Sequence, residues 1–288
     1  MPLSNIGFLV PKAPWTARIV GVASKAIILA HGDGAAIAIV GTASNMDARA
    51  FAIEGDYGRF ALVAAAELAR GGSRSGAAAA FDGVTLRASL RDGDLAEAAG
   101  DAILWDPRDS LRSAGSRAAA DCLADAADAI EAMVRTERDG REREGIHGDG
   151  AFALAFRKMK AAPGFPATIV GFGPGSTPSG DDWLAGYLTG RDLLEGGPGE
   201  AEPGLRTAVE ASLGRTSAAG KALLLGALAG APPAYLVELA LAATDAEHVD
   251  RLRNAVREAL GHGASSGEDA IAGFVAAIGC RRGRYDAV

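Results

Sequence analysis

The sequence predicts an α+β protein: a β-rich N-terminal part, like a small barrel or sandwich, packed on an α-rich C-terminal part. Short β-branched runs separated by turn residues occupy the first half of the chain. After Pro107, apolar residues recur at helical spacing. A glycine-rich motif with the pattern of a strand–loop–helix site then begins near residue 171. We therefore expect a β-rich domain at residues 1–110 and a mainly helical domain at 111–288.

In the N-terminal part, turn signals such as His31-Gly32-Asp33-Gly34 separate the candidate strands. We expect strands at Arg18–Ala23, Ala26–His31, Ala35–Val40, Ala48–Glu54, Val84–Leu90 and Ile103–Trp105. An alanine-rich helix is expected at Phe60–Arg70, because Gly71-Gly72 is a normal helix stop signal.

The C-terminal part is predicted to be helical except for one strand at Ala167–Phe172. We expect helices near Ser116–Glu137, Phe152–Lys160, Gly180–Leu194, Leu205–Leu213, Thr216–Leu228, Ala234–Ala243, Ala246–Leu260 and Gly267–Ile278. The stretch from Ala222 to Ala243 is apolar enough to test as a membrane span. However, Pro232-Pro233 interrupts it and Glu238 is costly in lipid, so two short buried helices are predicted.

Composition excludes several classes of function. The chain has 29 Lys and Arg against 36 Asp and Glu, a net charge of −7, which argues against nucleic-acid binding. The N-terminus lacks the features of a signal peptide, and no membrane segment is expected. The two cysteines, Cys122 and Cys280, are far apart and form no zinc-ligand pattern. These features predict a cytoplasmic protein.

The strongest local signal is the run Gly171-Phe-Gly-Pro-Gly-Ser-Thr-Pro-Ser-Gly-Asp-Asp182. Its alternating glycines permit positive φ and close approach of a ligand to the backbone. The run leads into a helix N-terminus, whose free N–H groups and dipole favour an anion. The spacing fits neither the dinucleotide-binding nor the Walker A pattern. We therefore predict a phosphate or carboxylate cradle.

An internal echo strengthens this prediction. The ten residues from Ser179 to Leu188 (SGDDWLAGYL) parallel those from Ser266 to Val275 (SGEDAIAGFV). Each copy is typical of a helix start, with Ser at the N-cap, Gly at N1 and Asp at N3. Capping alone explains the Ser and Asp. The second acid and the glycine-rich approach suggest instead that two helix starts face each other and share an anion.

Other candidates are weighed against structural roles. Asp181 and Asp182 could hold Mg²⁺, but adjacent helical residues point in different directions, so no metal or other cofactor is expected. His262 could interact with helix carbonyls or act as an acid–base group. Arg215 could bind a carboxylate. His147 lies in a polar loop; we expect it to be solvated, with a substrate contact as the less favoured alternative.

The motif Gly-x-Gly-Pro-Gly-x-Thr-Pro-Ser-Gly-Asp-Asp, the later Arg215-Thr-Ser, and Ser266-Gly-x-Asp resemble a bacterial family that was long a domain of unknown function. The resemblance covers about Thr168 to Phe274. The characterised branch of that family is a subunit of oxamate carbamoyltransferase, which acts in anaerobic allantoin breakdown. With other subunits, that enzyme converts oxalurate and phosphate into oxamate and carbamoyl phosphate.

The resemblance implies a carbamoyltransferase subunit with a small anionic substrate (phosphate, carbamoyl phosphate or oxalurate) and partner subunits, and it leaves room for a homo-oligomer. Asp182, Asp269 and His262 are the catalytic candidates. The anion-binding candidates are Gly173, Gly175, Thr177, Ser179, Gly180, Asp181, Arg215, Ser266 and Gly267. The chain could instead be a non-catalytic assembly subunit, or an enzyme of another acyl- or carboxyl-transfer type.

Overall fold

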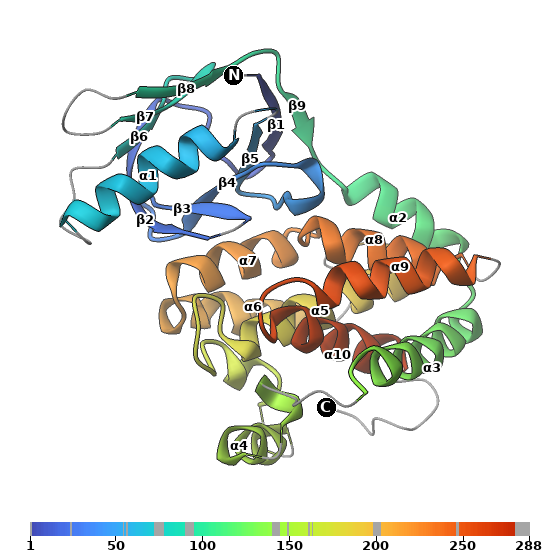
Figure 1. Cartoon of the computed structure of the whole chain (residues 1–288). Coiled ribbons are helices and arrows are strands. Elements are labelled where there is room, and N and C mark those ends of the chain that lie inside the picture. Colours follow the sequence, from blue (N-terminus) through green and yellow to red (C-terminus); the bar gives the residue numbers. More distant parts are fainter. Residues whose placement is uncertain are drawn as a thin grey trace. The chain divides into compact units, whose positions relative to one another are not determined.

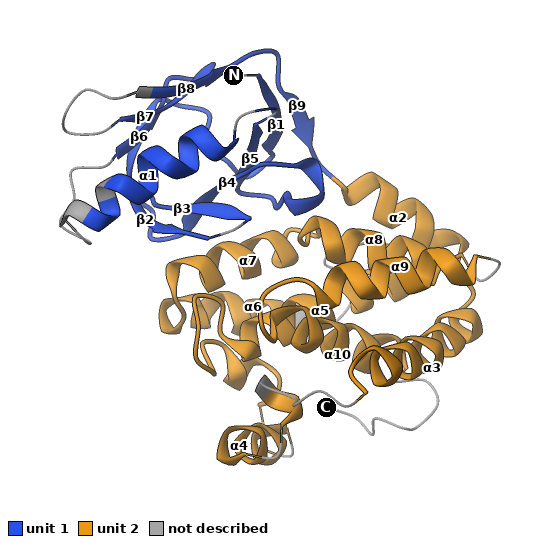
Figure 2. Cartoon of the chain, viewed as in Figure 1, with its two compact units in different colours: residues 1–106 blue, residues 107–288 orange. Residues whose placement is uncertain are grey.

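The computed structural model describes residues 2–279 apart from 24, 54, 56, 72–77, 90–94, 140–144, 149, 161, 163, 198–202 and 246–247. Strands fill the N-terminal half and helices the C-terminal half, so the predicted α+β class is confirmed (Figure 1). The chain divides into two compact units, residues 1–106 and 107–288 (Figure 2). Glu54, Leu90 and Ala246, which the sequence placed at the ends of elements, lie outside the described residues.

Unit 1 is built on a curled sheet. Its described strands are β1 (Leu3–Gly7), β2 (Trp15–Val22), β3 (Ala26–Ala30), β4 (Ala36–Val40), β5 (Ala50–Ile53), β6 (Ala78–Phe81), β7 (Thr85–Ser89), β8 (Leu95–Ala99) and β9 (Ile103–Trp105). The order is β8-β7-β6-β2-β3-β4-β5-β1-β9, and neighbours are antiparallel except β4–β5 and β1–β9. A parallel bridge joins Pro2, beside β1, to Ala99 on β8, which brings the two regions of the sheet together like a barrel.

The core of unit 1 follows from alternation along the strands. In β3 and β4, Leu29, Ile37 and Ile39 are fully buried. The helix α1 (Tyr57–Gly71) covers β2, β7 and β8 and buries Phe60 and Ala64 completely. A short 3-10 turn, η1 (Ala43–Asn45), connects β4 to the segment before β5.

The sequence did not predict β1, β6 or β8. The strands β6 (AAAF) and β8 (LAEAA) lack the β-branched residues that usually mark a strand. Both are strands because they pair with β7, in a register that sets Ala79 and Ala96 opposite Ala88. All three of these alanines are buried, so pairing and burial override the local helix preference.

The regular elements among the described residues of unit 2 are all helices. The helices are α2 (Arg108–Arg117), α3 (Ala120–Glu137), α4 (Ala151–Lys160), α5 (Ser179–Glu195), α6 (Pro203–Ser212), α7 (Ala218–Leu228), α8 (Ala234–Ala243), α9 (Val249–Leu260) and α10 (Ser266–Ile278). Short 3-10 turns, η3 (Gly145–His147), η4 (Ala167–Ile169) and η5 (Leu213–Arg215), link some of them.

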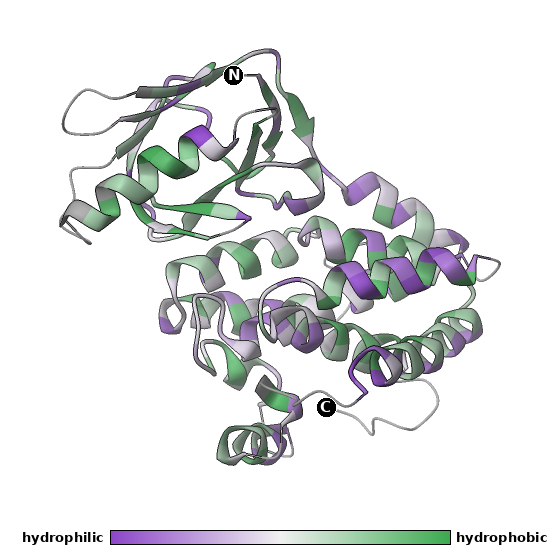
Figure 3. Cartoon of the chain, in the orientation of Figure 1, coloured by the Kyte–Doolittle hydropathy of each residue, from purple (hydrophilic) through white to green (hydrophobic). Residues whose placement is uncertain are grey.

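The helices α5 and α10 form the centre of unit 2. Nearly every residue of α5 from Ser179 to Leu193 is buried, and so is every residue of α10 from Gly267 to Ile278 except Ala272. By contrast, α9 buries Leu252, Val256 and Ala259 and exposes a charged face, which appears as alternating purple and green in Figure 3. The two helices that start at the glycine-rich motif and its echo are therefore the core of this unit.

The apolar stretch between Ala222 and Ala243 forms α7 and α8, with the break at Pro232-Pro233. The prediction of two short helices is therefore confirmed. Among the described residues, none of the helices combines the length and the apolar character needed to cross a bilayer.

The predicted strand at Ala167–Phe172 is wrong. Residues Ala167–Ile169 form η4, and the glycine-rich loop follows a 3-10 turn and not a strand. A strand needs a neighbour to pair its backbone groups, and the described part of unit 2 contains no sheet. The apolar side chain of Ile169 is buried against the helices instead.

Candidate functional site

The two central helices cross at a pair of glycines. A Cβ atom on Gly186 of α5 would overlap the carbonyl oxygen of Ala270, and one on Gly273 of α10 would overlap that of Trp183. In the sequence echo, Gly186 corresponds to Gly273, and Trp183 to Ala270. The contacts are therefore reciprocal, as expected for two copies related by a pseudo-twofold axis.

The reciprocity extends to the first turn of each helix. The N–H of Gly180 donates to the carbonyl of Phe172, and that of Gly267 donates to the carbonyl of His262. A Cβ on either glycine would overlap a carbonyl of a neighbouring segment, that of Ile169 or Ala259. Gly180 and Gly267 thus serve close packing, and their N–H groups are already used. An anion could reach these N–H groups only by breaking the two hydrogen bonds.

Neither Ser179 nor Ser266 is an N-cap, which corrects the expected capping. Each serine is the first residue of its helix, the preceding residues Pro178 and Ser265 are the N-caps, and no side-chain cap is formed. The geometry of Pro178, with φ −59° and ψ 144°, already starts α5 without help from a side chain. The serine hydroxyls are therefore not committed to the helix ends.

The two helix starts meet. The hydroxyl of Thr177, just before α5, lies 3.2 Å from that of Ser266 at the start of α10. The carboxyl of Asp182 is near the Ser266 hydroxyl, and that of Asp269 is near the Ser179 hydroxyl. Since the echo pairs Asp182 with Asp269, each acid approaches the serine of the other helix. The structure thus brings together the residues at both predicted starts.

Burial controls the protonation of the two acids. Asp182 and Asp269 are 2% and 0% exposed. Burial raises the pKa of Asp182 well above its usual range. The hydroxyls of Ser266 and Thr177 oppose this rise, whereas the charges of Asp269 and Asp181 add to it. One oxygen of Asp182 has no hydrogen-bond partner among the described residues. Burial therefore favours the neutral carboxylic acid form of Asp182.

Asp269 lies between the helix starts and η3. Burial raises its pKa to about 6, while the hydroxyls of Ser179 and Ser265 and the backbone of Ile146 lower it. None of these groups meets an Asp269 oxygen at full hydrogen-bond geometry in the described part of the chain. On the η3 side, Nε2 of His147 is 3.5 Å from an Asp269 oxygen, and the His147 side chain is 19% exposed. His147 is therefore not the solvated loop residue that the sequence predicted.

The raised pKa of Asp269 predicts a pH-dependent stability. The folded state binds this proton more tightly than the unfolded chain, in which the pKa is near 3.8. The stabilisation is complete below that value and is lost as pH rises through about 6. We expect the free energy of unfolding to fall over this window, and Asp269→Asn to reduce the fall. Urea titrations across the window measure it, and an equally steep fall in the variant contradicts the assignment. Part of the fall should remain in this variant, because the pKa of Asp192 is also raised to about 6 and Asp192 is unchanged.

Asp181 has a structural role. One of its oxygens accepts the N–H of Gly171 at 2.8 Å, and the other accepts the hydroxyl of Thr216. Burial raises the pKa of Asp181, although these two hydrogen bonds and the charge of Arg215 lower it. A Cβ on Gly220 would overlap both the Asp181 carboxyl and the Thr216 hydroxyl. Asp181 therefore ties the glycine-rich loop and the start of α7 to α5.

Removing the Thr216 hydroxyl should destabilise this junction. Thr216→Val leaves an oxygen of the buried Asp181 without its donor, so we expect a loss of about 1–3 kcal/mol in the free energy of unfolding. Thr136→Val, which removes an exposed hydroxyl bonded to the Ala132 carbonyl, is the control and should change little. Urea unfolding measures the free energy of unfolding of both variants. If both lose equally little, Asp181 does not hold this junction together.

The glycine-rich loop has the backbone that the sequence predicted. Gly171, Gly173 and Gly175 have φ values of 75°, 123° and 101°, a region that favours glycine. A side chain at Gly173 would press on the backbone of Ser179 and the ring of Phe152. Among the described residues, the N–H groups of Gly173 and Gly175 donate to no backbone carbonyl. The loop thus presents two backbone donors next to the start of α5.

Comparison with known proteins identifies this region. Residues 169–278 match the family described as oxamate carbamoyltransferase subunit AllH. Over this segment, which is less than half of the chain, the sequence is similar to the AllH family. The match contains the glycine-rich loop, both helix starts and the helices between them. A search of curated proteins found no match, and neither did a search of solved structures.

Two candidates within the AllH segment lie at the edge of the helix starts. The ring of His262 stacks on that of Tyr235, with centroids 4.3 Å apart. A terminal nitrogen of Arg215 donates to the carbonyl of Ala167 at 2.9 Å, and its charge lowers the pKa of Asp181. The proposed catalytic role of His262 and the carboxylate-binding role of Arg215 stay predictions.

Sequence reasoning missed three residues at this site. Tyr235, at the start of α8, is 3% exposed, and burial together with the charges of Asp182 and Asp269 raises its pKa well above the usual range. Arg138 contacts Glu268, the counterpart of Asp181, at 3.0 Å. His147 precedes the AllH segment. Only the polar loop that contains His147 marked this region, because the partners of His147 and Arg138 are distant in sequence.

Proposed function

We propose that this chain is a subunit of an oxamate carbamoyltransferase-like enzyme and that the paired starts of α5 and α10 bind its small anionic substrate. The AllH match supports the subunit role and the presence of other subunits. The observation that carries the site is the contact of Thr177 with Ser266, because it joins the motif and its echo at one place. Two helix N-termini directed at one place favour negative charge there.

The proposed reaction is phosphate-dependent carbamoyl transfer from oxalurate. A phosphate oxygen attacks the ureido carbonyl carbon, and the bond from that carbon to the internal amide nitrogen breaks. The nitrogen takes up a proton and leaves as oxamate, and the carbamoyl group remains on phosphate as carbamoyl phosphate. Phosphate is the nucleophile, so this route needs no nucleophilic side chain and no cofactor.

The residues of the helix starts suit these steps. In this proposal, the N–H groups of Gly173 and Gly175 and the hydroxyls of Thr177 and Ser179 hold the phosphate. Backbone donors stabilise charge on the attacked carbonyl oxygen. Asp182 contacts the amide nitrogens and, as a neutral acid, supplies the proton to the leaving nitrogen. A neutral Asp182 also avoids the repulsion that a carboxylate would exert on the phosphate.

A non-catalytic assembly subunit would use the small-residue faces of its helices as interfaces with its partners. The structure uses those faces inside unit 2, where Gly186 and Gly273 pack α5 against α10. The small residues at this crossing are therefore accounted for without a partner subunit. They do not favour the assembly role over the enzymatic one.

A ligand screen tests the proposed function. The purified chain is heated with phosphate, carbamoyl phosphate, oxalurate or a nucleotide, because a ligand that binds the folded state raises the unfolding temperature. We expect the three small anions to raise it, and Thr177→Val to reduce their effect. A rise with the nucleotide alone, or equal rises in the variant, would refute the proposed substrate site.

A further inference from the structure

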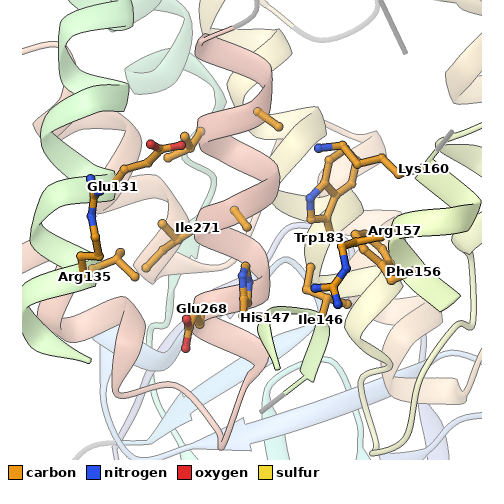
Figure 4. A pocket seen from close by; sticks show the side chains of 14 residues that line it. Glu131, Arg135, Ile146, His147, Phe156, Arg157, Lys160, Trp183, Glu268 and Ile271 are labelled. Carbon is orange, nitrogen blue, oxygen red and sulfur yellow. The ribbon is translucent and has the colours of Figure 1, made fainter. Parts of the chain in front are cut away.

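A cavity of about 460 Å³ lies within unit 2. Segments α3, η3, α4, α5 and α10 line it, and Figure 4 shows their side chains. Its volume is in the range of small-molecule sites, roughly 300–1,000 Å³. The proposed reaction uses none of the residues that line it.

The floor of the cavity is apolar and aromatic. Phe156, Trp183, Ile271 and Val275 contribute to it, and all four are at most 4% exposed over the whole residue. The rings of Phe156 and Trp183 lie edge to face with centroids 6.2 Å apart. Such a floor favours a flat apolar group, because aromatic side chains bind ring systems through their faces and edges.

The rim carries positive charge on the α4 side. Arg157 and Lys160 border the cavity there, near Phe156 and Trp183 (Figure 4). The acids are on the opposite side: Glu131 lies one turn from Arg135 on α3, and Glu268 contacts Arg138 at 3.0 Å. The α4 side of the rim is therefore basic, although the chain as a whole has a net charge of −7.

The helix dipole alone does not explain why basic residues of α4 border the cavity. Three basic residues occupy the last turn of α4, where they favour the helix dipole. Arg157 and Lys160 border the apolar cavity, whereas Lys158 does not. One terminal nitrogen of the Arg157 guanidinium makes a long 3.4 Å hydrogen bond to the Gly148 carbonyl. A guanidinium beside an aromatic floor is suited to an anionic head group.

We propose that this cavity binds a small aromatic anion, with the ring on Trp183 and Phe156 and the phosphate or carboxylate head at Arg157 and Lys160. The proposal does not depend on the anion site at the helix starts. His147 lines the cavity and lies 3.5 Å from Asp269, so the two sites are neighbours.

Calorimetric titration of the full chain with phenyl phosphate tests this proposal. We expect phenyl phosphate to bind more tightly than phenol or inorganic phosphate, because only phenyl phosphate fills both parts of the site. Arg157→Met should weaken its binding roughly tenfold, the effect of losing a hydrogen bond to a charged group. Lys158→Met, the adjacent basic residue of α4, is the matched control and should leave the affinity unchanged. Arg157 is exposed, so both variants should fold.

Thr177→Val separates the two sites. We expect this change to leave phenyl phosphate affinity intact, since Thr177 does not line the cavity. If phenyl phosphate does not bind, or if Arg157→Met and Lys158→Met have equal effects, the proposal is overturned. Weakening by Thr177→Val without weakening by Arg157→Met would place the ligand at the helix starts and would also overturn it. None of these results depends on carbamoyl transfer.

Discussion

Asp182→Asn should lower the rate of carbamoyl phosphate formation from oxalurate and phosphate by roughly 10²–10⁴-fold in the assembled enzyme. The expected loss follows from the environment of the carboxyl group: burial raises the pKa of Asp182 and so favours the protonated form, which can donate a proton. Asparagine has nearly the same shape and can fill the site, but it cannot supply this proton. The substitution should therefore reduce catalysis while preserving the fold.

The stability of the same variant distinguishes catalysis from folding. The proton of Asp182 is lost at high pH, which leaves a buried charge, whereas asparagine stays neutral at every pH. The free energy of unfolding of the variant at neutral pH should therefore be unchanged or higher. Asp192→Asn is the control, because Asp192 is also on α5 but away from the helix starts, and the change breaks its partly buried ion pair with Arg206 of α6. That control should lower stability and leave the rate constant unchanged. A full rate in Asp182→Asn would exclude Asp182 as the acid.

Gly186→Ala and Gly273→Ala should each destabilise the chain by about 3 kcal/mol. At either position the new methyl group would overlap a backbone carbonyl oxygen of the other helix, that of Ala270 or Trp183. A backbone atom cannot move aside like a side chain, so α5 and α10 must separate. The separation would also pull apart the helix starts and lower substrate affinity.

Gly214→Ala provides the comparison for these two variants. Nothing lies within 4 Å of a Cβ on Gly214, which is in the same unit. This change should be neutral or slightly stabilising, because alanine restricts the unfolded chain. Urea unfolding monitored by far-UV circular dichroism compares the three variants. If Gly186→Ala is as mild as Gly214→Ala, the close crossing of the helices is incorrect.

The echo of Ser179–Leu188 in Ser266–Val275 made much of the site predictable. Repeated residues at the same spacing imply the same local backbone, and the structure brings the two copies together. Their capping was misjudged, because Pro178 and Ser265 fix the helix starts and leave the serines for contacts between helices. A local pattern cannot show which partner a side chain will meet.

Long-range contacts explain the other failures. The strand β8 contains residues that favour helices and is a strand only because β7 pairs with it. Ala167–Phe172 has the composition of a strand, but no neighbouring strand is described in unit 2. His147 was predicted to be solvated, and its contact with Asp269 spans more than a hundred residues. Such positions depend on the folded partner and not on neighbouring residues in the sequence.

The paired helix starts are tested most directly by calorimetric titration of the chain with inorganic phosphate. Thr177 and Ser266 lie on different copies, so Thr177→Val and Ser266→Ala should weaken binding by similar factors of roughly ten. Ser212→Ala, which removes an exposed hydroxyl of α6 in the same unit, should bind phosphate like the unaltered chain. Equal affinity in all four proteins would contradict a shared anion site at the starts of α5 and α10.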